Sequence, residues 1–138
     1  MKLKELLDEI KTLHLKLKHD NELIEFYEEQ SLRIPGPVYD QEKVDVQPSG
    51  KAPFEKWIFK KLDKEQEMKG TIEELEEKKI IALNALEKLK NKDLEFFILY
   101  RYVSFMSYEE ISKKMHYSRS TIYRLKAEAI VVIETLEV

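Results

Sequence analysis

Hydrophobic residues recur with the heptad spacing of a coiled coil over residues 2 to about 31. The two series of this seam are Leu3, Ile10, Leu17 and Ile24, and Leu6, Leu13 and Tyr27, the second interrupted once by Asp20. The pattern predicts a long helix whose apolar seam must pack against another helix of the chain or against a copy of itself. A symmetric dimer would bring two Asp20 carboxylates face to face, so pairing within the chain is favoured.

The next segment, residues 35 to 53, has a different composition. It contains all four prolines and two of the three glycines of the chain. Proline removes a backbone donor and fixes φ, so this segment is not expected to be helical. We interpret it as a mobile linker that allows the following helix to double back.

A second long helix is predicted over residues 54 to 90, with Pro53 at its start. Its apolar residues can share one broad face: Phe54, Ile58, Leu62, Ile72, Leu75, Ala82, Leu86 and Leu89. Gly70 weakens the middle of the helix by about 1 kcal/mol relative to Ala, so a break or bend is expected there. An antiparallel hairpin would cover both long apolar faces. For the three aromatics between Phe54 and Phe59, core packing is favoured over a patch that binds a partner.

Residues 91 to 138 show the pattern of several shorter helices. Ser107 with Glu110 forms a predicted capping box, and Ser118 is a second helix cap candidate. The apolar positions after these caps are Ile111 and Met115, and then Ile122, Leu125, Ala129 and Val132 or Ile133. A supporting helix precedes them, with Leu94, Phe97, Ile98, Tyr102 and Val103 as its apolar residues. Two helices joined at His116 to Ser118 match a helix-turn-helix, and the apolar end of the last helix should pack on the body or on a second copy.

The outward side of the helix that begins at Arg119 carries hydrogen-bond donors and no carboxylate. Its members are Arg119, Ser120, Thr121, Tyr123, Arg124 and Lys126. Guanine edges and phosphates in the major groove accept hydrogen bonds from such side chains. In this hypothesis Arg119 and Arg124 read guanine, and Ser120 and Thr121 make shorter contacts. Phosphates are held by Lys113, Lys114, Tyr123 and Lys126. The alternative is a solvated face in an ordinary three-helix domain; DNA binding is favoured because caps, turn and charge coincide.

The distribution of charge supports this interpretation more than the total does. The net charge is −3 and argues against indiscriminate coating of nucleic acid. Residues 101 to 126, however, carry six basic residues against two acidic ones, whereas residues 127 to 138 carry three acidic residues and no base. A basic patch confined to one segment of an acidic protein is typical of a DNA reader.

The motifs around these residues resemble region 4 of the bacterial sigma-70 family, which reads an upstream promoter element. The matching segments are Arg101-Tyr102, Met106 to Ile111 and Ser118 to Arg124, within about Asp93 to Ile130. The resemblance implies that Arg119, Ser120 and Arg124 reach base edges and that Lys114, Thr121 and Tyr123 lie near the backbone. His116 stands where the family has Gly, so it must take a positive φ or the turn must differ. Nothing upstream resembles sigma region 2.

Other functional classes find no support in the composition. Cysteine is absent, which excludes disulfides, thiolate nucleophiles and cysteine-based zinc sites. His14 and His19 lie five residues apart and are interpreted as surface histidines rather than metal ligands. There is no catalytic triad context and no glycine-rich phosphate loop, so we expect no enzymatic activity, no catalytic residue and no cofactor. Without a signal peptide or a long apolar run, a soluble cytoplasmic protein is expected.

The sequence therefore predicts an all-α protein, with a long N-terminal helical hairpin or coiled coil followed by a C-terminal helix-turn-helix domain. Its layout resembles small phage-encoded transcriptional regulators of the ArpU/RinA type, which implies action at phage or host promoters. Double-stranded DNA is the expected partner; RNA polymerase and a second copy through the long helices are further candidates, and no membrane is involved. Two alternatives stay open: a small-terminase-like packaging protein that assembles as a ring, and a module that docks on polymerase or a sigma factor without touching DNA.

Overall fold

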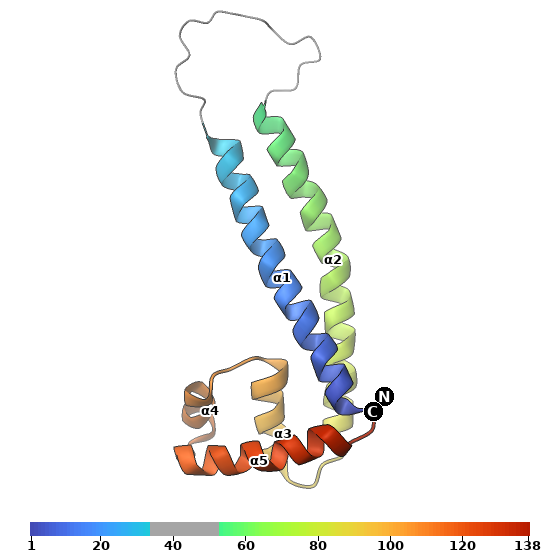
Figure 1. The fold of residues 1–138 in the computed structure, drawn as a ribbon, viewed down its shortest axis with the longest axis vertical. Coiled ribbons are helices and arrows are strands. Elements are labelled where there is room, and N and C mark those ends of the chain that lie inside the picture. Colours follow the sequence, from blue (N-terminus) through green and yellow to red (C-terminus); the bar gives the residue numbers. More distant parts are fainter. Residues whose placement is uncertain (34–52) are drawn as a thin grey trace, which may run out of the picture. The chain divides into compact units, whose positions relative to one another are not determined.

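The computed structural model describes residues 1–33 and 53–138, and the chain is all-α, as the sequence predicts. The elements are α1 (Leu3–Leu32), α2 (Pro53–Leu86), α3 (Lys92–Ile98), a π-helix η1 (Leu99–Val103), α4 (Tyr108–Met115) and α5 (Arg119–Thr135) (Figure 1). In the described ranges the only strand-like pairing is an isolated bridge between Lys2 and Glu137. The linker predicted over residues 35 to 53 lies almost wholly outside these ranges; its last residue, Pro53, begins α2.

The chain forms two compact units, each built partly from α1 and partly from α2. The smaller unit is residues 16–72, and the larger unit is residues 1–15 together with 73–138. In both units the two helices exchange ion pairs between their facing sides, such as Lys61 with Glu28 at 3.1 Å in the smaller and Lys78 with Glu9 at 2.8 Å in the larger. The α1 seam is therefore occupied by α2 of the same chain.

Asp20 occupies the interrupted seam position and is buried in the smaller unit, with 3% of its surface exposed. Its carboxylate lies 3.5 Å from the Lys16 ammonium and 3.8 Å from the Lys64 ammonium. Glu67 accepts hydrogen bonds from both lysines, at 3.1 Å from Lys16 and 3.0 Å from Lys64. A buried charge needs such partners, and α2 supplies Lys64 for this purpose. The charged residue that interrupts the apolar seam is therefore paired with lysines of the same chain.

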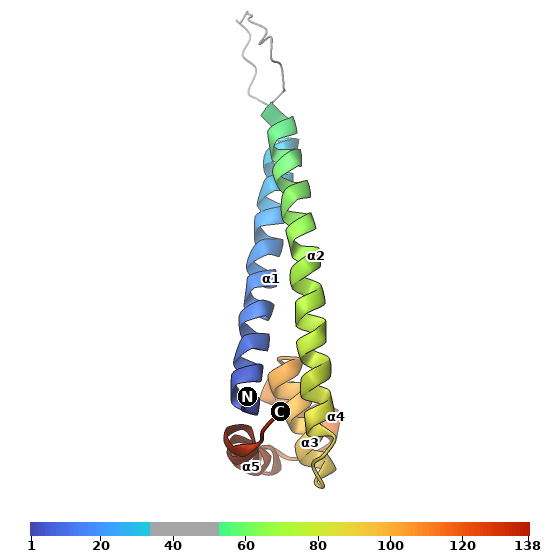
Figure 2. The same ribbon diagram turned by 90° about the vertical axis from the view of Figure 1, so that its right-hand side faces the viewer.

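The larger unit contains the main hydrophobic core and both chain ends. Its buried residues come from every helix of the unit: Leu3, Leu6, Leu7, Ile10, Leu75, Ala82, Ala85, Leu86, Leu94, Phe97, Ile98, Val103, Ile111, Ile122, Leu125, Ala129 and Ile133. The backbone N–H of Leu3 donates to the carbonyl of Leu136 at 2.8 Å, and that of Val138 donates to Met1 at 2.9 Å. Figure 2 shows the two ends side by side. The end of α5 packs on the body, as predicted.

Two expectations about the second long helix were wrong in detail. Its apolar face was expected to include Phe54, Ile58, Leu62 and Ile72, but these side chains are 37–53% exposed. The side of α2 that faces α1 instead contains Trp57, Lys61, Lys64, Met68 and Thr71. The helix ends at Leu86 rather than Lys90, because turn hydrogen bonds from Lys88 and Leu89 replace the helical ones before Asn91 caps α3. No break occurs at Gly70, since α2 is one uninterrupted helix.

The aromatic residues at the start of α2 are only partly buried. Trp57 packs edge-on against Phe26 of α1 at 5.8 Å between ring centroids and lies 6.0 Å from Tyr27. Phe54 and Phe59 are 46% and 48% exposed. Core packing, the favoured interpretation of this group, therefore accounts for Trp57 but not for the two phenylalanines.

Candidate nucleic-acid interface

Helices α4 and α5 are bounded by the caps that the sequence predicts. The Ser107 hydroxyl accepts a hydrogen bond from the Glu110 N–H at 3.1 Å, and the Ser118 hydroxyl accepts one from the Thr121 N–H at 3.4 Å. The capping box differs in one bond, since the Glu110 carboxylate accepts from the Ser107 hydroxyl at 3.1 Å, whereas a standard box closes on the backbone N–H of the cap. Both serines have an extended backbone, and each is the N-cap residue of the helix that follows it.

The turn between the two helices is set by His116. This residue has φ 60° and ψ 38°, which is the left-handed conformation and the first of the two alternatives that the sequence left open. Its N–H donates to the Ser112 carbonyl, and the Ser112 hydroxyl donates to the Tyr117 carbonyl at 2.5 Å. Since these bonds close the end of α4, the direction in which α5 leaves the turn is fixed by local interactions.

Buried side chains of α3, α4 and α5 hold this unit together. Ile111 of α4 and Ile122 and Leu125 of α5 are at most 1% exposed, and Phe97 of α3 is fully buried between them and the rest of the core. The inward side of α5 is therefore committed to the core, as the helical periodicity predicts. Its opposite side faces solvent.

Arg119, Ser120 and Arg124 of α5 are exposed. In the part of the chain that the structure describes, neither guanidinium takes part in an ion pair, and the first turn of α5 contains no acidic residue. Thr121 is half-buried, and its hydroxyl lies 3.2 Å from that of Ser118, as does the hydroxyl of Ser120. The two arginines are thus the freest donors of the predicted set.

The side chains of the remaining predicted residues contact neighbouring groups. Lys113 pairs with Glu109 at 3.7 Å, and both side chains are nearly four-fifths exposed. The ammonium of Lys114 lies 5.2 Å from the Tyr100 ring centre, and that of Lys126 lies 5.2 Å from the Tyr108 ring centre. These distances are typical of cation–π contacts, which hold an ammonium near the surface without neutralising it. Tyr123 is half-exposed, with its ring 6.2 Å from that of Tyr108.

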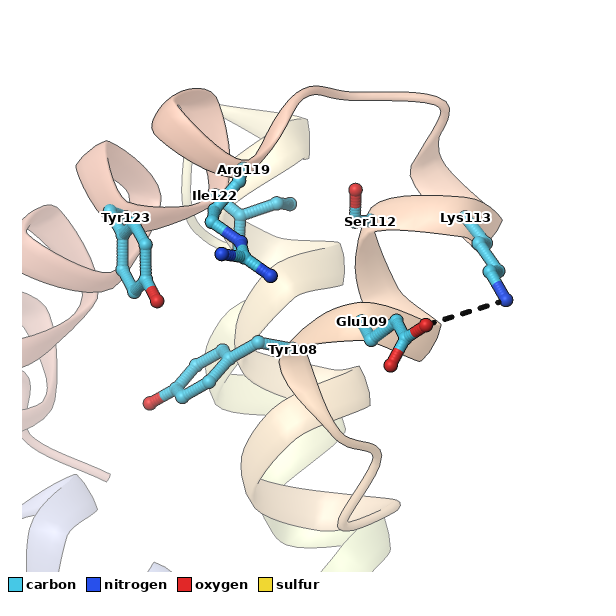
Figure 3. A pocket seen from close by; sticks show the side chains of 7 residues that line it. All are labelled: Tyr108, Glu109, Ser112, Lys113, Arg119, Ile122 and Tyr123. Carbon is cyan, nitrogen blue, oxygen red and sulfur yellow. Dashed lines mark ion pairs between the residues drawn. The ribbon is translucent and has the colours of Figure 1, made fainter.

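A hollow lies between the start of α5 and α4 (Figure 3). Its lining is Tyr108, Glu109, Ser112, Lys113, Arg119, Ile122 and Tyr123. Figure 3 shows the Arg119 guanidinium projecting over this hollow from the first turn of α5. Besides the buried Ile122 and the two tyrosines, the lining residues are polar or charged. The hollow offers donors at its rim rather than an apolar cavity for a small molecule.

Sequence reasoning missed the part that Arg101 and Tyr108 play beneath this surface. The Arg101 guanidinium donates to the Met106 carbonyl at 2.8 Å and lies 4.2 Å from the Tyr108 ring centre. Tyr108 also stacks on the buried Phe97, with 6.3 Å between centroids. In the sequence, Arg101 stands out only as a positive charge and as part of the sigma-like motif. Its structural role depends on the π-helical turn Leu99–Val103, and a hydrophobic pattern gives no sign of such a turn.

Phe105 lies in the loop between η1 and α4 and has a φ of 57°. A bulky residue in this region costs on the order of 1 kcal/mol or more, so its surroundings must hold it there. The His14 ring of α1 stacks on Phe105 with 4.2 Å between centroids, and the Met106 N–H donates to the Tyr100 carbonyl at 2.9 Å. His14, expected as a surface residue, is half-buried by this stack, while His19 is exposed.

Other kinds of site are not found in the described ranges. No group of three or more His, Asp or Glu side chains there is arranged to hold a metal ion. None of the described helices is long and apolar enough to cross a membrane. No family model, no curated protein and no solved structure matches the chain.

Proposed function

We propose that this protein is a sequence-specific DNA-binding regulator of transcription. In this proposal α4 and α5 act as a helix-turn-helix, and the first two turns of α5 enter the major groove. The observation that carries it is the exposure of Arg119 and Arg124 on a helix start without carboxylates, neither of them in an ion pair within the described residues. A guanidinium that reads guanine must be free to make two parallel hydrogen bonds to the base edge.

The roles of the other residues follow from what their side chains touch. Lys113 and Lys114 of α4 and Lys126 of α5 lie on either side of the arginines in the chain, and their long basic side chains suit phosphates on the rims of the groove. Ser120, Thr121 and Tyr123 add neutral donors beside the arginines. One such unit makes few phosphate contacts, so useful affinity calls for a second copy or a polymerase partner. The resemblance of this segment to sigma region 4 supports a promoter as the target, and the resemblance of the whole layout to ArpU/RinA-type regulators supports a phage or prophage as the source.

The decisive experiment is selection of binding sites from random duplexes with three forms of the full chain. The wild type should enrich a defined motif, and Arg124→Ala should enrich a motif with one position relaxed. Arg33→Ala is the matched control, because it removes one exposed arginine outside α4 and α5 and should leave the motif unchanged. If no duplex is enriched while RNA polymerase is captured, the protein is instead a docking module that does not read DNA.

A further inference from the structure

Helix α2 carries a second apolar face in the smaller unit, which we call the outer stripe. Its residues recur every three or four positions and therefore share one side of the helix: Phe54, Ile58, Leu62, Glu65, Lys69 and Ile72. The four apolar members are exposed by 46%, 37%, 53% and 44% in that order. Large side chains exposed in a row along one helix are typical of a surface that another helix covers.

The outer stripe is distinct from the side of α2 that faces α1. That side contains Trp57, Met68 and Thr71, of which the last two are buried. At 3.6 residues per turn the two faces are separated by about 100° around the helix axis. A helix with two apolar faces at nearly a right angle suits a four-helix bundle, where each helix contacts two neighbours. One neighbour is α1, and the other is not present within a single chain's described residues.

The part of the outer stripe from Leu62 to Ile72 is complementary to itself. Counted from position 67, Glu65 and Lys69 lie two residues to either side, and Leu62 and Ile72 lie five residues to either side. If α2 packs antiparallel on a copy of itself with position 67 at the two-fold axis, Glu65 faces Lys69 and Leu62 faces Ile72, each twice. A surface that matches itself in this way is what an isologous interface requires.

The charges of the stripe are available for such pairing. Neither Glu65 nor Lys69 takes part in an ion pair in the described part of the chain, although they stand one helical turn apart. Glu65 acts electrostatically on Lys61, but the Lys61 ammonium is already paired with Glu28 at 3.1 Å. A parallel arrangement would set Glu65 against Glu65 and Lys69 against Lys69. Charge therefore selects the antiparallel orientation.

We propose that a second copy of this chain packs antiparallel on the outer stripe of α2, so that the α1–α2 pairs of the two copies form a four-helix bundle. The interface is the same surface on both copies, with the Glu65 to Lys69 pairs beside the two-fold axis and the Leu62 to Ile72 pairs next to them on either side. This inference does not depend on DNA binding, and its test is carried out without DNA.

Sedimentation equilibrium of the full chain tests the proposal. The wild type should be a dimer, and Leu62→Glu should weaken the association by at least about 30-fold, as expected for a central interface residue. Leu15→Glu is the matched control, because Leu15 is 51% exposed, close to the 53% of Leu62, and lies on α1 away from the stripe. Circular dichroism confirms that each variant is helical. A wild-type monomer at roughly 100 μM, an assembly larger than a dimer, or equal effects of the two variants would overturn the proposal.

Charge variants and cross-linking test the orientation. Glu65→Lys and Lys69→Glu should each weaken the dimer alone, because each creates like-charge pairs, whereas an equimolar mixture of the two should associate again. The chain has no cysteine, so Glu65→Cys and Lys69→Cys chains can be mixed and oxidised. An antiparallel dimer gives the mixed disulfide in preference to either homodimer. Preferential cross-linking between two Glu65→Cys chains contradicts the antiparallel arrangement.

Discussion

The phenol of Tyr117 donates a hydrogen bond of 2.7 Å to the Asp93 carboxylate, which ties the turn between α4 and α5 to the first turn of α3. This hydrogen bond and the negative charge of Asp93 raise the pKa of the Tyr117 hydroxyl. The group stays protonated in the folded state at a pH where an ordinary tyrosine ionises. Its contribution to stability is therefore present below the ordinary value of 10.0 and is lost as pH rises through the raised pKa.

We expect Asp93→Asn to lower the pKa of Tyr117, because the carboxylate that opposes the tyrosinate is removed. The measurement is an ultraviolet titration of tyrosine absorbance, with the Tyr117→Phe variant subtracted to isolate the one phenol. The exposed Asp63→Asn is a suitable control, since Asp63 lies on α2 in the smaller unit. Identical titration curves in the wild type and Asp93→Asn would show that the hydrogen bond is not formed in solution.

Arg119 and Arg124 should differ from Lys114 in how their loss affects DNA binding. Replacing either arginine with Ala should cost about 1 to 3 kcal/mol on the selected site and relax the choice of base there. Lys114→Ala should weaken specific and random duplexes alike and reduce the dependence on salt, because an ammonium near a phosphate carries no sequence information. The measurement is a fluorescence-anisotropy titration of both duplexes at several salt concentrations. Equal losses on both duplexes for the arginine variants would count against base reading.

Arg101 should matter for the stability of the larger unit rather than for DNA contact. Arg101→Ala removes the hydrogen bond to the Met106 carbonyl and the contact with the Tyr108 ring, which should lower the free energy of unfolding by about 1 to 3 kcal/mol. Arg101→Lys should restore only part of the loss, since an ammonium lacks the planar group that stacks and donates together. Urea denaturation gives the comparison. Full recovery in the lysine variant would mean that charge alone is responsible.

How well the sequence predicts this structure depends on whether a signal is local. The caps at Ser107 and Ser118 were predictable, because each depends on residues within one turn. The left-handed His116 was one of two alternatives that the sequence left open. The heptad seam of α1 was predictable because one helix carries it. The face of α2 that packs on α1 was not predictable. Counting apolar residues favours the outer stripe, whereas the side that packs on α1 includes Lys61 and Lys64. Their packing depends on Glu28 and Asp20, more than 30 positions away.

The site shows the same limit. The exposed arginines of α5 could be placed from helical periodicity alone, because the inward positions Ile122 and Leu125 fix the outward ones. The contacts that hold the structure beneath these arginines could not be predicted in this way. They depend on the π-helical turn that contains Arg101 and on Phe105, which has a positive φ and stacks on His14 of α1. These are contacts between distant segments, which a single sequence does not encode in any short pattern.

Glu67 should make the stability of the smaller unit sensitive to acid. Its hydrogen bonds with Lys64 and then Lys16 lower the pKa of the Glu67 carboxyl below the usual 4.5. A lowered pKa contributes stability that is present above pH 4.5 and is lost as pH falls through the folded-state value. The difference in melting temperature between the wild type and Glu67→Gln should therefore be largest near neutral pH and shrink in acid. Glu29→Gln, on the exposed side of α1, should show no such convergence.

Gly70 offers a way to strengthen α2 without altering any contact. The helix runs through this residue without interruption, and a Cβ added there would meet no atom within 4 Å. Alanine loses less backbone freedom than glycine on folding, so Gly70→Ala should raise the free energy of unfolding by about 0.5 to 1 kcal/mol. Urea denaturation measures the change, and DNA affinity should be unaffected because Gly70 lies outside α4 and α5. A destabilised variant would mean that α2 needs glycine at this point, for example to bend in solution or to allow a close approach by a second chain.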